Sequence, residues 1–348
     1  MADRDRDIES GGTAPIAADR KPPRLADVAA HAGLTSMTVS RALRQPDKVS
    51  PATRERVMQA ISELGYIPDL AASSLASRRS RIIAVVVPTI ANSVFADTVQ
   101  GLSDGVAAAG YQLLLGQTGY SETAEHALVA ALIGRRPDAV AHIGIVRDPA
   151  LRDLLRRAAV PIVETWDLTA DPLDLLVGFS NEAAGRAIGE YLIGRGYRRI
   201  AFVGGRDDRA AARRSGLRAA LDAAGLDASR EAITDEPLSY GAGRRALAAL
   251  LDGGGPPDAV FFATDVLAVG GLMECRRRKL SVPGRIAIAG LGDLEIAAEL
   301  TPALTTVRVP SYEIGRRAAD MLLARIEGEP IASPIVDLGF EIVQRESA

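Results

Sequence analysis

From Arg81 to about residue 292, short apolar runs alternate with stretches of helical periodicity, and this alternation limits the fold more than any other feature. The first run, IIAVVVP at residues 82–88, is continuously apolar. Such a run is typical of a strand buried on both faces of a parallel sheet. Helical stretches long enough to cross a sheet follow these runs, so the chain predicts repeated strand–helix–strand units.

The alternation falls into two series. The first contains the runs IIAVVVP, YQLLLG, DAVAHIGI and PIVET, with helices expected near 95–109, 122–133 and 149–158. The second starts at DLLVGFS and continues through RIAFVGG, DAVFFAT and RIAIAG, with helices expected over 182–195, 210–224 and 266–279. This predicts an α/β body of two similar doubly wound halves. Ligands bind such sheets at the carboxyl ends of the strands, and two facing halves form a cleft.

The composition supports a globular chain with more than one domain. The chain has 348 residues, of which 47% are hydrophobic, enough for a large core. It contains no uncharged apolar run of about 18 residues, the length that suggests a transmembrane helix. Residues 1–23 alternate in charge, so we expect a disordered leader and no signal peptide. The single cysteine, Cys275, suits a reducing compartment, and we predict a cytoplasmic protein.

Residues 24–68 have the pattern of a small all-α domain. The first predicted helix has an i, i+3, i+4 apolar face, and Gly33 ends it. Thr35 is a good N-cap for a second helix over residues 36–43, and a third helix is expected to end at Gly65. The two short helices joined by a tight turn predict a helix-turn-helix.

Positive charge gathers around this domain. Residues 20–80 carry ten Lys and Arg against five Asp and Glu, whereas residues 81–348 carry 29 against 34. A basic segment ahead of a mildly acidic body suits a nucleic-acid-binding domain attached to a globular one.

The second helix presents a polar face suited to the major groove of DNA. Arg41 can form two hydrogen bonds to guanine, and the residues at the helix start can reach base edges, thymine methyls and phosphates. Each residue alone is more simply interpreted as part of a solvated helix face, but the set that follows Ala29-x3-Gly33 favours DNA. The candidate DNA-binding residues in this region are Thr35, Ser36, Met37, Thr38, Ser40, Arg41 and Arg44.

The run LADVAAHAGLTSMTVSRAL, followed by VSPATRERVMQAISELGYIP and LAASSLA, resembles the head of the LacI family of bacterial repressors. The resemblance implies that the second helix enters the major groove and that residues 69–80 form a hinge helix on the operator. It assigns to Leu75 the wedge in the minor groove. A helix this short is marginal alone in water, so we expect it to form conditionally. Two positions depart from the family, because Arg24 replaces a threonine cap and Asp69-Leu70 replaces Asn-Arg.

The resemblance also implies a body of two Rossmann-like subdomains, similar to periplasmic sugar-binding proteins. The expected domains are the leader 1–23, the helix-turn-helix domain 24–68, the hinge helix 69–80 and an effector-binding and dimerisation body 81–348. Within the body, one subdomain is expected to comprise about 81–179 with 309–338, and the other 180–308 with the C-terminal strand. A homodimer is implied, with a tetramer as the alternative.

Candidate effector-binding residues follow the predicted strands. Phe95 could stack on a sugar, although a core aromatic is an equal interpretation. Arg213 matches the effector-binding arginine of the family, whereas Arg209 and Arg214 are predicted to be solvated. The candidate effector-binding residues are Asn92, Phe95, Glu164, Trp166, Arg213, Asp265 and Asp293.

Longer stretches, among them NSVFADTVQGLSD, GYQLLLGQTGYS and IAIAGLGDLEIA, resemble the gluconate-repressor branch. This implies a sugar acid such as gluconate as the effector. The residues are compatible, because Arg213 can clamp a carboxylate while Asp265 and Asp293 accept hydroxyls. Gly292 stands where the family often has another acidic residue, which eases binding of an anion. A neutral sugar or another small metabolite, including a co-repressor, is the alternative.

Two other classes of function are less well supported. No Gly-x-Gly-x-x-Gly, Walker or Gly-x-Ser-x-Gly pattern occurs, and the three histidines lie far apart, so we predict no catalytic site, metal or cofactor. A free-standing sugar-binding protein would not need the helix-turn-helix domain. The sequence therefore predicts a transcriptional repressor, not an enzyme, that binds double-stranded operator DNA and a small carbohydrate.

Overall fold

The structure is a computed structural model that describes residues 22–67, 79–90 and 93–348. Its contacts divide the chain into a first unit that ends at Ser80 and a second unit, Arg81–Ala348. We call the described residues 22–67 the head and residues 81–348 the body, and each is described by itself. The predicted leader and hinge helix lie almost entirely outside the described residues. Within those residues, no helix has the length and apolar character needed to cross a membrane.

The head is a three-helix domain built from α1 (Leu25–His31), α2 (Ser36–Arg44) and α3 (Pro51–Leu64), with a short 3-10 turn η1 at Pro46–Lys48. Gly33 adopts a left-handed φ of +62° between α1 and α2, and Gly65 ends α3 with the same φ, as the sequence predicted. The helices close over a small core of buried side chains: Val28, Ala29, Ala32, Val39, Ala42, Val57 and Ala60.

The body contains two six-stranded sheets with the orders β11-β5-β4-β3-β1-β2 and β12-β10-β9-β8-β6-β7. Every strand pair is parallel except β10 with β12. The first sheet contains β1 (Ile82–Val87), β2 (Gln112–Gln117), β3 (Ala139–Ile143), β4 (Ile162–Thr165), β5 (Leu175–Gly178) and β11 (Ile335–Asp337). The second contains β6 (Ile200–Gly204), β7 (Glu231–Ile233), β8 (Ala259–Phe262), β9 (Ala287–Gly292), β10 (Thr305–Arg308) and β12 (Glu341–Val343).

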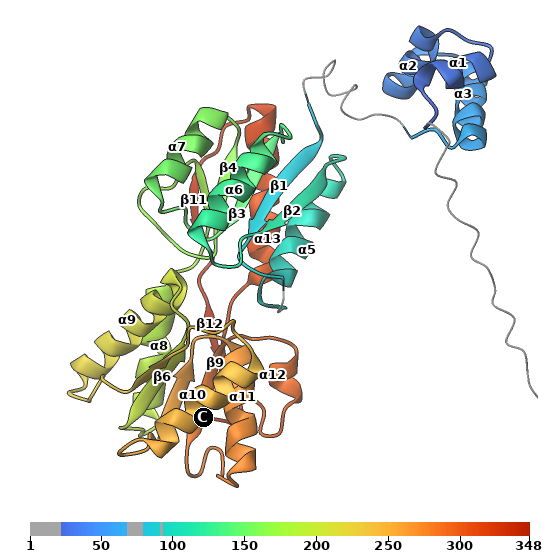
Figure 1. The fold of residues 1–348 in the computed structure, drawn as a ribbon. Helices are drawn as coiled ribbons and strands as arrows, with labels where there is room; N and C mark the ends of the chain where they lie inside the picture. Colours follow the sequence, from blue (N-terminus) through green and yellow to red (C-terminus); the bar gives the residue numbers. More distant parts are fainter. Residues whose placement is uncertain (1–21, 68–78, 91–92) are drawn as a thin grey trace, which may run out of the picture. The chain divides into compact units, whose positions relative to one another are not determined.

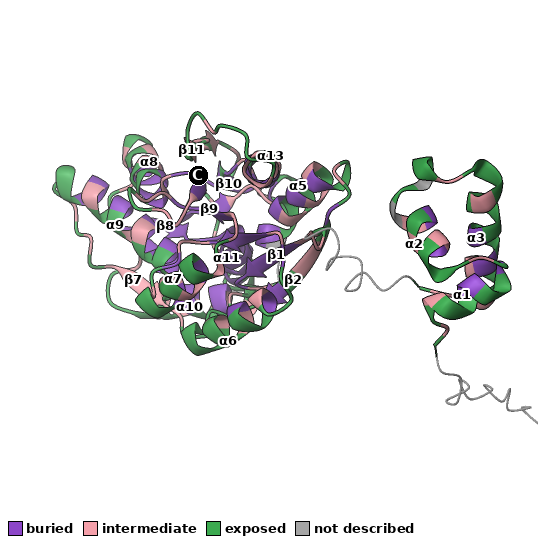
Figure 2. Ribbon diagram, turned by 90° about the horizontal axis from the view of Figure 1, so that it is seen from above, coloured by how far each residue is buried: buried purple, intermediate pink, exposed green. Residues whose placement is uncertain are grey.

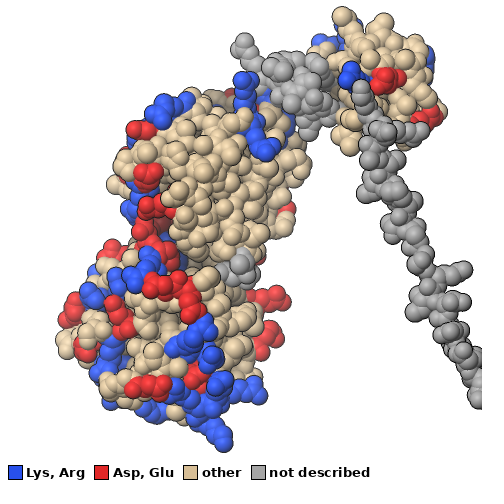
Figure 3. All heavy atoms as spheres, in the orientation of Figure 1, with Lys and Arg blue, Asp and Glu red and all other residues tan. Residues whose placement is uncertain are grey.

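Helices cover both sheets (Figure 1). The first sheet carries η2 (Ser93–Phe95), α5 (Ala96–Ala107), α6 (Glu122–Ile133), α7 (Pro149–Ala158) and α13 (Ser311–Glu327). The second carries α8 (Asn181–Gly194), α9 (Asp208–Ala223), α10 (Tyr240–Asp252), α11 (Asp265–Arg277) and α12 (Ile296–Glu299). The central strands are buried while the helices expose their outer faces (Figure 2). Figure 3 shows few charged side chains over the face formed by β2, α5 and α6.

The chain passes between the two sheets after β5, after β10 and after β11. The strand–helix alternation assigned DLLVGFS to the second series, but β5 pairs with β4 and β11 in the first sheet, so that assignment was wrong. Order along the chain does not reveal which sheet a strand joins. The sequence analysis also did not identify β7 and α10.

Candidate functional site

In the head, helix α2 exposes its polar face, so this face is accessible to a partner molecule. The hydroxyl of Thr35 accepts a hydrogen bond from the amide of Thr38 at 3.2 Å, which starts the helix as the sequence predicted. Val39 and Ala42 are buried on the inner face. The outer face carries exposed Ser36, Met37 and Arg41, with Thr38 and Ser40 half-buried. Met37 is 72% exposed, which is unusual for a large apolar side chain and suits contact with an apolar group of a partner.

The charge of the head is modest. Residues 22–67 hold six Lys and Arg against four Asp and Glu, so most of the positive excess of residues 20–80 lies in the flanking segments. The side chain of Arg44 is not among the described atoms, and Leu75 lies outside the described residues. The described part of this candidate DNA-binding face therefore comprises the start of α2 and Arg41.

The body contains a cleft lined by residues that follow strands of both sheets. Its inner chamber has a volume of about 20 Å³. From the first-sheet half it is lined by Val94, Phe95, Tyr120 and Trp166, and from the second-sheet half by Asp207, Arg209, Ala210, Arg213, Leu238, Ala263 and Thr264. Phe95 meets the edge of Trp166 with ring centroids 4.9 Å apart. The structure thus brings together three of the predicted effector-binding residues, Phe95, Trp166 and Arg213.

Arg213 is 4% exposed and is held by the protein. Its Nε donates to Oδ1 of Asn181 at 2.8 Å, and its Nη1 donates to the carbonyl of Ala263 at 2.5 Å. Burial lowers the pKa of Arg213 to about 10, although Asp207 opposes that shift. Even with this shift the guanidinium stays charged at neutral pH.

The backbone of Arg213 is fixed by close packing of α8 on α9. A Cβ on Gly216 would lie 1.9 Å from the carbonyl of Glu182, and a Cβ on Gly185 would lie 2.0 Å from the carbonyl of Arg213. Only glycine allows the two helices to approach this closely. The helix crossing therefore sets the position from which Arg213 reaches the chamber.

Arg209 was predicted to be solvated, but it is 8% exposed and lines the cleft. Its guanidinium lies over the ring of Phe95 at 4.9 Å, and its Nε lies 3.8 Å from Asp207. That prediction was wrong because Arg209 stands one helical turn before Arg213 on α9 and shares its face. Arg214 is half-buried and pairs with Glu231 at 3.2 Å, outside the chamber lining.

An outer chamber of about 140 Å³ shares Tyr120, Asp207 and Arg209 with the inner one. Its remaining lining combines charged and polar side chains with a few apolar residues: Pro88, Thr118, Glu122, Glu125, His142, Ile143, Gly144, Ile145, Arg147, Asp167 and Asp208. The sequence analysis missed Tyr120 and Asp207, although each lies three residues after a strand end, where ligands of parallel sheets bind.

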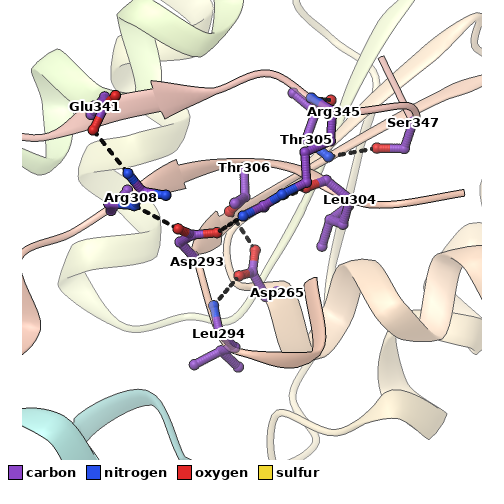
Figure 4. Close-up of polar contacts among 10 residues, drawn as sticks. All are labelled: Asp265, Asp293, Leu294, Leu304, Thr305, Thr306, Arg308, Glu341, Arg345 and Ser347. Carbon is purple, nitrogen blue, oxygen red and sulfur yellow. Dashed lines mark hydrogen bonds and ion pairs between the residues drawn. The ribbon is translucent and has the colours of Figure 1, made fainter. Parts of the chain in front are cut away.

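Asp265 and Asp293 lie in a separate network (Figure 4). The carboxylate of Asp265 accepts hydrogen bonds from the hydroxyl of Thr306 at 2.6 Å and the amide of Leu294 at 2.9 Å. Asp293 pairs with Arg308 at 2.6 Å and Arg345 at 2.7 Å. Neither aspartate is among the residues that line the two chambers, because each is engaged where β9, β10 and the C-terminal segment meet.

Burial also shifts the protonation equilibrium of the Asp265 carboxyl. It is fully buried, and this raises the pKa of its carboxyl to about 6. Gly292, next to Asp293, has a φ of +137°, which L-amino acids with side chains rarely adopt. The backbone conformation at this position therefore favours glycine.

Glu164 and Asn92 complete the predicted effector set. Glu164 is fully buried, and its two carboxylate oxygens accept hydrogen bonds from the amides of Val146 at 2.8 Å and Leu173 at 2.7 Å. It ties two loops together and lines neither chamber. Asn92 lies outside the described residues.

Comparison with known proteins agrees with this arrangement. Residues 24–69 match the model of bacterial regulatory proteins of the lacI family, and residues 190–348 match a periplasmic binding protein-like domain. The HTH-type transcriptional regulator GntR of Pseudomonas aeruginosa is 37% identical over 327 residues, which cover 93% of this chain and 95% of that protein.

Two solved structures show the same fold. A LacI-family transcriptional regulator from Silicibacter pomeroyi superimposes with a TM-score of 0.88 at 32% identity, covering 94% of this chain and 99% of that one. The lac repressor dimer bound to operator and the anti-inducer ONPF gives a TM-score of 0.80 at 26% identity, covering 94% and 99%.

A helix-turn-helix head joined to a periplasmic binding protein-like body defines a DNA-binding transcriptional regulator, and the similar proteins are regulators, not enzymes. The chain belongs to the LacI family.

Proposed function

We propose that this regulator binds a sugar acid such as gluconate in the cleft of its body, and that the ligand controls its affinity for the operator of sugar-acid catabolic genes. The observation that carries the proposal is the pair of buried arginines, Arg209 and Arg213, beside the rings of Phe95 and Trp166. Buried guanidinium groups favour a carboxylate, and aromatic rings pack against the carbon chain of a sugar. The similarity to a regulator named GntR agrees with a gluconate-type effector.

Several residues predicted from the sequence are not retained in the proposed ligand contacts. Glu164 binds two backbone amides, and Asp265 and Asp293 are engaged with Thr306, Arg308 and Arg345. The proposed effector contacts are Phe95, Trp166, Arg209 and Arg213, with Asn92 kept because it follows the first predicted strand.

In the head, the proposed DNA contacts are the exposed and half-exposed residues of α2. Arg41 reads a base by a two-point contact, and Met37 meets thymine methyls. The segment 69–80 folds as a hinge helix on DNA, where Leu75 opens a base step from the minor groove. The full proposed set is Thr35, Ser36, Met37, Thr38, Ser40, Arg41, Arg44 and Leu75.

The proposed assembly is a homodimer in the cytoplasm that places two heads on a pseudo-palindromic operator. A face with few charges supports it: Leu115 on β2 is 38% exposed, and α6 exposes a set of alanines, Ala124, Ala127, Ala130 and Ala131. Uncharged faces of this kind suit protein contact. A tetramer is the alternative.

Ligand binding can change the affinity for DNA only if the ligand binds two states of the dimer with different affinities. Residues from both halves line the cleft, so closure around a ligand moves the two halves relative to each other. In the proposed mechanism this motion changes the separation of the two hinge segments and releases the operator.

The test is calorimetric titration of the full-length protein with gluconate and with sorbitol, a neutral polyol of similar length. We expect saturable binding of gluconate and at least tenfold weaker binding of sorbitol. Arg209→Gln should weaken gluconate binding at least tenfold, whereas Arg214→Gln, a neighbour outside the chambers, should leave it within about twofold. Binding of sorbitol or another neutral sugar in preference to gluconate would favour the second candidate, a regulator with a neutral effector or co-repressor.

A further inference from the structure

The two chambers of the cleft differ sharply in size. The inner chamber, at about 20 Å³, has room for one or two water-sized groups, whereas the outer chamber has about 140 Å³. The two are adjacent, because Tyr120, Asp207 and Arg209 line both. A carboxylate fits the inner chamber, but the six-carbon chain of a sugar acid does not.

The two chambers also differ in charge. Arg213 is the charged residue that belongs to the inner chamber alone among the described residues. The charged groups that belong to the outer chamber alone are Glu122, Glu125, Asp167 and Asp208, with Arg147 and the titratable His142.

Two basic side chains of the outer chamber, Arg147 and His142, each contact a carboxylate. Arg147 lies 2.6 Å from the carboxylate of Asp208, and His142 lies 2.6 Å from that of Glu125. The outer chamber then holds two arginine–aspartate pairs, Arg147 with Asp208 and Arg209 with Asp207, beside the carboxylates of Glu122, Glu125 and Asp167. The electrostatic potential is therefore more negative there than beside Arg213 in the inner chamber.

We infer that the effector spans both chambers, with its carboxylate in the inner chamber and its hydroxylated chain in the outer one, and that the outer chamber excludes a sugar acid phosphorylated at the far end. The inference rests on the proposed function, since it assumes that the ligand carries a carboxylate. Carboxylates accept hydrogen bonds from ligand hydroxyls, whereas a phosphate dianion has only acceptors and is repelled by them.

Asp167 is the residue best placed to bind the chain of the ligand. It is 8% exposed and lines the outer chamber, and one of its carboxylate oxygens accepts from the amide of Leu168 at 2.9 Å. That hydrogen bond fixes the carboxylate and leaves further lone pairs for ligand hydroxyls. Asp167 also lies close enough to Arg213 to affect its ionisation, so the two ends of the ligand site are adjacent.

The experiment is a paired titration of the full-length protein with gluconate and with 6-phosphogluconate under the same pH and ionic strength. We expect the phosphorylated acid to bind at least tenfold more weakly. The double variant Glu122→Gln/Asp208→Asn should narrow that ratio at least threefold, because it removes two carboxylates and releases Arg147. The matched control is Asp222→Asn, an exposed carboxylate farther along α9, which should leave the ratio unchanged.

Each outcome separates the inference from the proposed function. Equal or tighter binding of 6-phosphogluconate, or a ratio unaffected by the double variant, would overturn the exclusion while leaving the sugar-acid effector intact. Binding of neither acid, together with binding of a neutral sugar, would overturn both.

Discussion

Asn181 links the buried Arg213 to the opposite half of the cleft. Its Oδ1 accepts a hydrogen bond from Nε of Arg213 at 2.8 Å, and its Nδ2 donates to the carbonyl of Trp166 at 2.8 Å. Asn181 begins α8 on the second-sheet half, whereas Trp166 follows β4 on the first-sheet half. One buried amide therefore orients Arg213, the proposed effector-binding group, and at the same time joins the two halves.

Asn181→Ala should weaken effector binding about tenfold to a hundredfold, because a hydrogen bond to a charged group contributes about 1.5–3 kcal/mol. Operator affinity without effector should stay within about twofold. Calorimetry measures the first quantity and fluorescence anisotropy of a labelled operator the second. Wild-type effector affinity in Asn181→Ala would contradict this role.

Arg41→Ala should weaken operator binding by about 1–3 kcal/mol, the range for one two-point base contact, and should relax discrimination at one base pair per half-site. Anisotropy with the operator and with single-base variants measures both effects. The control is Arg156→Ala, an exposed arginine on α7 of the body, for which no change is expected. A uniform loss across all sequences would instead identify Arg41 as a phosphate contact.

Gly216→Ala should destabilise the body by about 1–3 kcal/mol, because the added methyl group would overlap the carbonyl of Glu182 and separate α8 from α9. Effector affinity should fall in the same variant, since Arg213 moves with α9. Gly194→Ala is the matched control, because a Cβ there meets no atom within 4 Å. Urea unfolding followed by the fluorescence of Trp166, the single tryptophan, compares the two variants. Equal stability of both would show that the helix crossing can relax.

Asp265 should make the body less stable as the pH rises from 5 to 7.5. Its folded-state pKa of about 6 lies above the ordinary value of 3.8, so between these values the folded state binds the proton more tightly. The stabilisation is complete below the pKa of Asp265 in the unfolded chain, and it is lost as the pH rises through the pKa of Asp265 in the folded protein. Between pH 5 and 7.5, the free energy of unfolding of the wild type should fall by about 1 kcal/mol more than that of Asp265→Asn. Parallel pH profiles for the two proteins would argue against a protonated Asp265 at pH 5.

Local signals in the sequence were sufficient for the elements that depend on neighbouring residues. Thr35 caps α2, and the left-handed glycines Gly33 and Gly65 end the head helices, because capping and φ preferences act within one helical turn. The limits of α6 and α7 agree with the predicted helices 122–133 and 149–158. Most of the apolar runs form buried parallel strands, as β1, β3, β6 and β8 show. The run YQLLLG forms the parallel strand β2, which is largely exposed or half-buried, and β5 was assigned to the wrong series.

The composition of the cleft was decided by tertiary structure. Arg209 and Arg214 looked alike in sequence, yet the first lines the chamber with Arg213 and the second pairs with Glu231. Spacing of four residues along α9 distinguishes them, but only the packing of α9 shows which face meets the cleft. Asp265 follows a strand as a ligand-binding residue should, and it instead binds Thr306 from β10. Local sequence patterns specified most of the helices and strands and the class of protein, whereas contacts between distant segments placed the charged groups that line the cleft.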